Sequence, residues 1–76
     1  MEHLDTRVAE SLKAMLDEAG ITVRVAAART GIPLTTLHRK IVGPRRTSLT
    51  VTELADLAAL LGVDASKIVA RAEAAA

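Results

Sequence analysis

Between residues 22 and 48 the chain carries side chains that bind anions and donate hydrogen bonds. This segment has six basic residues and no acidic one, a charge of +6, whereas residues 1–21 carry −3 and residues 49–76 carry −2. Localised positive charge favours a polyanion bound on one face, and the alternative is an ordinary solvated surface. The basic residues are Arg24, Arg29, Arg39, Lys40, Arg45 and Arg46.

Residues 31–43, GIPLTTLHRKIVG, combine several of these side chains with the pattern of a short helix. The proline stands near the start, where the N–H group that it lacks is not needed. Leu34, Leu37 and Ile41 recur at spacings of three and four, which predicts one apolar stripe. The other face is polar and has no acidic residue: it carries Thr35, Thr36, His38, Arg39 and Lys40.

The chain offers little support for an enzyme. It contains no Cys, and its two His residues stand 35 positions apart without the local spacing of a zinc site. Neither a Ser/His/Asp arrangement nor a glycine-rich phosphate loop is present at a useful spacing. We therefore expect no catalytic residue, no metal and no cofactor.

Composition narrows the class of binding partner. Phe, Tyr and Trp are all absent, so the core must be aliphatic and bases cannot stack on aromatic side chains. Such stacking is what many RNA-binding and single-strand-binding modules use. No apolar run approaches the roughly 18 residues that a membrane span needs, and the acidic N-terminus does not resemble a secretory signal. We expect a protein of the cell interior that does not enter membranes.

The periodicity predicts an all-α protein, a compact bundle of about five short helices in one domain, residues 1–76. Apolar residues recur with helical spacing in five segments, separated by breaks that contain Gly or Pro. Thr22 and Asp64 stand where helix caps are expected. Thr50-Val51-Thr52-Glu53 matches a capping box, with Leu49 and Leu54 placed as a hydrophobic staple.

Residues 22–43, TVRVAAARTGIPLTTLHRKIVG, resemble a helix-turn-helix, with the spacing Ala27-x-x-x-Gly31-Ile32 and a buried aliphatic position at Leu37. Residues 50–69, TVTELADLAALLGVDASKIV, are similar to the fourth and fifth helices of the lambda-repressor-like family (Cro/C1, xenobiotic-response-element type). That family's domain is a bundle of about five helices, so the resemblance covers nearly the whole chain. The pattern GIP-x-x-TLHR looks especially like small repressors of actinobacterial phages and their hosts.

The resemblance implies that the helix after Pro33 lies in the major groove of double-stranded DNA. The residues that it places against bases are Leu34, Thr35, Thr36, His38 and Arg39. Of these, Arg39 suits guanine, and the Thr35 methyl group or Leu34 suits the methyl group of thymine. His38 suits a guanine N7 or a phosphate, or is simply solvated. The residues that it places at phosphates, or in a flanking minor groove, are Thr22, Arg24, Lys40, Arg45 and Arg46.

Two positions depart from the family pattern. The family often has Gln at the start of the second helix, where it contacts a phosphate and braces a base-reading side chain. Val23 stands there in this chain, so that contact is absent or moves to Thr22 or Arg24. The family also often has a Ser cap at the third helix, where Pro33 has no side chain that can cap.

The function implied is sequence-specific binding of a double-stranded DNA operator by a transcription regulator, a phage-type repressor or Cro-like protein in the cytoplasm of a bacterial host cell. Such a short chain is expected to bind as a monomer or as a weak homodimer. Ile68, Val69 and Ala72 of the last helix either pack inward or form part of a dimer surface. The alternative function is a protein-interaction module, such as an antitoxin or adaptor, with the same fold.

Overall fold

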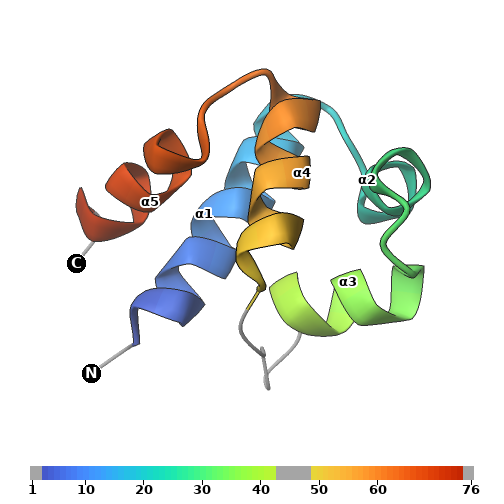
Figure 1. Ribbon diagram of the computed structural model, residues 1–76, viewed down its shortest axis with the longest axis horizontal. Coiled ribbons are helices and arrows are strands. Elements are labelled where there is room, and N and C mark those ends of the chain that lie inside the picture. The colour runs from blue at the N-terminus through green and yellow to red at the C-terminus, as the bar shows by residue number, and fades with distance from the viewer. Residues whose placement is uncertain (1–2, 43–48, 75–76) are drawn as a thin grey trace.

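The structure, a computed structural model, describes residues 3–42 and 49–74. These residues form five α-helices and no strand, which confirms the predicted all-α bundle. Figure 1 shows α5 at one end of the bundle, α2 and α3 at the other, and α1 and α4 between them. The helices are α1 (Leu4–Glu18), α2 (Val23–Thr30), α3 (Leu34–Ile41), α4 (Val51–Leu61) and α5 (Ala65–Ala74).

Two helices begin at the caps that the sequence predicts. The Thr22 hydroxyl accepts a hydrogen bond from the backbone N–H of Val25 at 3.2 Å, at the start of α2. At the start of α4, the Thr50 hydroxyl accepts from the Glu53 N–H at 3.0 Å, and the Glu53 carboxylate accepts from the Thr50 N–H at 2.8 Å. This reciprocal pair is a complete capping box, which satisfies N–H groups that the first turn leaves without helical partners.

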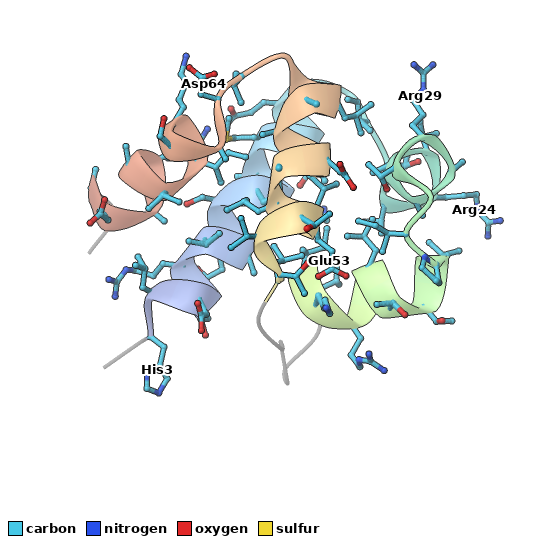
Figure 2. All side chains as sticks on the ribbon, in the orientation of Figure 1. His3, Arg24, Arg29, Glu53 and Asp64 are labelled. Carbon is cyan, nitrogen blue, oxygen red and sulfur yellow. The ribbon has the colours of Figure 1, made fainter. Side chains whose placement is uncertain are left out.

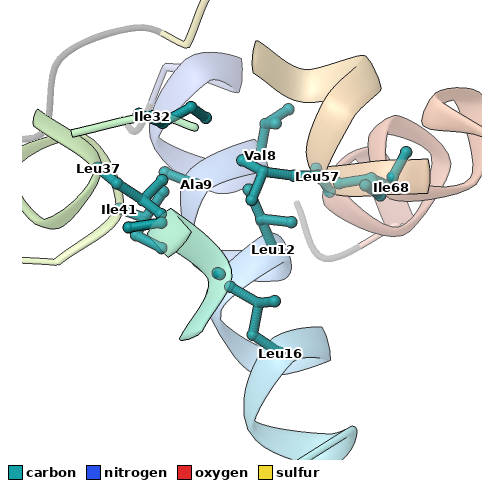
Figure 3. Packing of buried hydrophobic residues seen from close by; sticks show 13 residues of the cluster. Val8, Ala9, Leu12, Leu16, Ile32, Leu37, Ile41, Leu57 and Ile68 are labelled. Carbon is teal, nitrogen blue, oxygen red and sulfur yellow. The ribbon is translucent and has the colours of Figure 1, made fainter. Parts of the chain in front are cut away.

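The core is wholly aliphatic and draws on all five helices. Figure 3 shows side chains of α1 lying between those of α3 on one side and those of α4 and α5 on the other. Because no aromatic ring is available to fill space, the core depends on close contact between many small branched side chains. The largest fully buried side chains are Leu12, Leu16, Leu37, Ile41, Leu57 and Ile68.

Helix α5 is held against α1, which answers the question that the sequence left open. Ile68 and Ala72 are fully buried, whereas Val69 is half-buried. At the surface, the Arg71 guanidinium makes two hydrogen bonds, at 2.9 and 2.6 Å, to the two carboxylate oxygens of Glu18. Two of the three candidate dimer residues therefore pack inward.

A tight turn around Gly31 joins α2 to α3. Gly31 has a φ of +81°, in the left-handed region that favours glycine. The Thr30 hydroxyl donates to the Ala26 carbonyl at 2.7 Å and accepts from the Ile32 N–H at 3.4 Å. Ala26 and Ile32 are buried, so a small side chain on α2 lets the backbones approach while Ile32 fills the corner.

We expect Gly31→Ala to lower the free energy of unfolding by about 1 kcal/mol, because an alanine resists the left-handed conformation. A Cβ at Gly31 would meet no atom within 4 Å, so the cost is one of backbone conformation alone. Urea unfolding followed by far-UV circular dichroism measures it.

Gly62→Ala is the matched control, since Gly62 has a φ of +73° and the same open surroundings at the end of α4. The two variants should lose similar stability, and Gly31→Asn should lose less because Asn tolerates this region. A loss of several kcal/mol confined to Gly31→Ala would show a steric role that the structure does not contain.

Candidate nucleic-acid interface

Helix α3 has one anchored face and one open face. Leu37 and Ile41 are fully buried, as the predicted stripe requires. Thr35, His38 and Arg39 are exposed. Because these three stand at spacings of three and four, they share one side of the helix. The anchored face fixes the helix to the bundle and leaves donors and acceptors directed toward solvent.

An open hollow of about 470 Å³ lies between the start of α2 and α3. It is lined by four of the five residues that the resemblance places against bases, together with Arg24 and Val23 from α2. Figure 2 shows Arg24 projecting from α2 on the side of the molecule away from α1 and α5. We call it the α2–α3 hollow. The residues that line it are Val23, Arg24, Leu34, Thr35, His38 and Arg39.

The fifth of those residues, Thr36, lies elsewhere. It is half-buried and does not line the α2–α3 hollow. Successive residues of a helix point about 100° apart, so Thr36 turns away from the side that carries Thr35 and Arg39. The structure therefore brings four of the five together and leaves Thr36 at the edge of this face.

The residues predicted to meet phosphates occupy different settings. Thr22 caps α2, and its hydroxyl accepts from a backbone N–H while keeping its own proton available for donation. Arg24 is exposed and is one of the residues that line the hollow. Arg45 and Arg46 lie outside the described residues. Thr22 and Arg24 both stand at the N-terminal end of α2, where the helix dipole also favours an anion.

Lys40 differs from the predicted phosphate contacts Thr22 and Arg24, because it forms an ion pair with Glu53 within the fold. Its Nζ atom lies 2.7 Å from the Glu53 carboxylate, and the two side chains are only 13% and 18% exposed. Figure 2 shows Glu53 at the start of α4, beside α3. The hydrogen bond from Lys40, followed by that from the Thr50 backbone N–H, lowers the pKa of Glu53 below its usual range. Lys40 therefore joins α3 to the capping box of α4, and a phosphate role for it remains a prediction.

Sequence reasoning missed this pair, although it identified both partners separately. In the sequence, Lys40 belongs to the positive segment and Glu53 to the capping box. The two stand 13 positions apart, across the segment 43–48 that the structure does not describe. No local periodicity links residues at that separation, so only the packing of α3 beside α4 reveals the contact.

Two observations bear on other classes of site. Within residues 3–42 and 49–74, no group of three or more His, Cys, Asp or Glu side chains gathers in a way that would hold a metal ion. Across the same part of the chain, none of the helices has the length and apolar character needed to cross a membrane.

We expect Glu53→Gln to destabilise the fold by about 1 kcal/mol at neutral pH, since glutamine can still complete the capping box but leaves the Lys40 charge without its partner. The folded-state pKa of Glu53 is lowered, so its contribution is present above the unfolded pKa and is lost as pH falls through the folded value. The difference between wild type and variant should therefore shrink below the usual glutamate pKa of about 4.3.

Thermal unfolding at several pH values measures this difference. Glu73→Gln, the same change at an exposed position of α5, is the control and should change stability little at any pH. A wild type–variant difference for Glu53→Gln that stays constant down to the acid transition would contradict the ion pair.

Comparison with known proteins agrees with this geometry. A family model described as helix-turn-helix, of the Cro/C1 type, matches residues 12–68, which run from the middle of α1 into α5. Comparisons with curated proteins and with solved structures gave no significant match. The matched family consists of DNA-binding regulators rather than enzymes. The chain therefore belongs to the Cro/C1-type (XRE) helix-turn-helix family and is a DNA-binding transcription regulator of that type.

Proposed function

We propose that this regulator is a sequence-specific repressor of the phage or Cro-like kind, which inserts α3 into the major groove of its operator. The observation that carries the proposal is the division of α3 into a buried face and an exposed face. Leu37 and Ile41 hold the helix to the core, while Thr35, His38 and Arg39 stand free at the surface. A helix anchored in this way can present side chains to base edges without rearranging.

The side chains of the α2–α3 hollow suit different parts of a duplex. Arg39 can donate two hydrogen bonds to guanine O6 and N7, and Thr35 can donate to or accept from a base edge. His38 suits a guanine N7 or a phosphate. Thr22 and Arg24 are placed for a phosphate at the N-terminus of α2. In this proposal Arg45 and Arg46 extend the contact to further phosphates or to a flanking minor groove.

Repression would follow from occupancy alone, because the operator-bound protein blocks polymerase or another regulator. We propose that residues 1–76 act as one DNA-binding domain in the cytoplasm of a bacterial host cell. Since Ile68 and Ala72 are buried against the bundle, a homodimer would have to use other residues. Monomeric binding, or weak dimerisation on neighbouring half-sites, fits this arrangement best.

Gel-shift titrations across a range of salt concentrations test the proposal against a protein-interaction role. A sequence-specific regulator keeps its preference for a selected operator over competitor duplex at about 150 mM salt. Complete loss of DNA binding at that salt would favour an antitoxin or adaptor whose basic face meets an acidic protein. Selection from random duplex DNA supplies the operator, and the symmetry of the selected sites reports the stoichiometry.

We expect Arg39→Ala to weaken binding to the selected operator by about 5- to 150-fold, the factor that corresponds to the 1–3 kcal/mol of a bidentate arginine–guanine contact. Base preference should relax at one position of each site. Fluorescence anisotropy on operator and on random duplex measures both effects.

Arg29→Ala is the charge-matched control. Arg29 is exposed on the same helix pair but lines a separate hollow with Asp56, outside the α2–α3 hollow. Its removal should change binding only slightly and equally on both duplexes, whereas Arg45→Ala should weaken both duplexes by a similar, larger factor. Equal losses on operator and random DNA for Arg39→Ala would rule out a base-reading role.

A further inference from the structure

The α2–α3 hollow has an apolar part formed by Val23 and Leu34, which pack against the hydrophobic core and also line the hollow. Val23 and Leu34 line it and are half-buried, whereas Arg24, His38 and Arg39 are exposed. The two aliphatic side chains therefore lie deeper than the charged ones around them. Val23 is the first residue of α2 and Leu34 is the first residue of α3, so residues 11 positions apart meet at one surface.

The major groove contains one apolar group that suits such a surface. Guanine, adenine and cytosine present nitrogen and oxygen atoms there, while thymine also presents its C5-methyl group. A donor or acceptor placed against valine and leucine would lose its hydrogen bonds to water without replacement. A methyl group placed there would instead leave water, which is favourable.

We infer that Val23 and Leu34 together form a methyl-binding subsite that takes the C5-methyl group of one thymine in the major groove. This inference depends on the proposed reading of DNA by α3, and it names a specificity-determining residue, Val23, that hydrogen-bonding arguments overlook. Val23 discriminates thymine from cytosine by contact with the methyl group, while Arg39 reads an adjacent base and Arg24 meets the backbone.

Both walls of the subsite are held in place before DNA arrives. The Thr22 cap fixes the start of α2, immediately before Val23. Pro33, with its ring-restricted φ of −55°, precedes Leu34. Valine is also stiff about χ1, so little side-chain freedom is lost when a methyl group binds. A preformed apolar surface of this kind gives selectivity with little ordering cost.

The first test leaves the protein unchanged. Each thymine of the selected operator is replaced in turn by deoxyuridine, which removes only the methyl group, and affinity is measured by fluorescence anisotropy. For each bound protein we expect one thymine whose replacement weakens binding about fourfold, the factor that corresponds to burying one methyl group. If no replacement changes affinity, the inference is wrong.

The second test asks whether Val23 is one of the side chains that contact the thymine methyl group. In Val23→Ala the cost of that one deoxyuridine replacement should fall from about fourfold to about twofold or less, because one wall is shortened. Val25→Ala is the matched control: Val25 lies on the same helix, is 42% exposed and does not line the hollow. It should keep the full methyl dependence, and the inference fails if the two variants behave alike.

A third comparison separates the methyl group from base pairing. At the same position, a C–G pair should bind more weakly than T–A, and 5-methylcytosine should recover about fourfold relative to cytosine. No recovery would overturn the methyl contact.

Different experimental results would contradict the proposed function and the methyl-binding subsite. If selection yields no preferred sequence, both are wrong; if it yields a tightly bound operator without methyl dependence, only the methyl-binding subsite is wrong.

Discussion

An eight-residue helix is not stable in water by itself, and this constraint governs the structure around α3. The helix persists because Leu37 and Ile41 are fully buried against the bundle. Leu34 also packs in part against this core, whereas Thr35, His38 and Arg39 are exposed. Leu37 and Ile41 therefore belong to the core and also fix the orientation of the exposed face of α3.

Polar contacts add to the packing of the core in joining α3 to the neighbouring helices. The Lys40–Glu53 ion pair joins the end of α3 to the capping box of α4, and the turn at Gly31 sets the approach of α2 to α3. These contacts lie at the two ends of α3, where a short helix frays most readily. The two contacts join α3 to α4 at one end and to α2 at the other.

Much of the fold follows from local rules. The caps at Thr22 and Thr50 and the aliphatic stripes were predicted because each depends on residues within four positions of one another. The burial of Ile68 and Ala72, by contrast, was left open, since both interpretations of α5 fit the same periodicity. The structure decided it by packing α5 on α1, where Arg71 also reaches Glu18.

The sequence by itself determined the class of the protein: an aliphatic all-α bundle with a positive segment and a polar, acid-free helix face, whose resemblance to Cro/C1-type regulators the family match confirms. The tertiary structure alone decided which side chains share a surface. It brought Val23 of α2 and Leu34 of α3 to one hollow, and it paired Lys40 of α3 with Glu53 of α4. The physical reason is the separation of these residues along the sequence. Helical periodicity relates only neighbours along one helix. The α2–α3 hollow and the ion pair form between different helices, whose relative placement depends on the packing of the whole core.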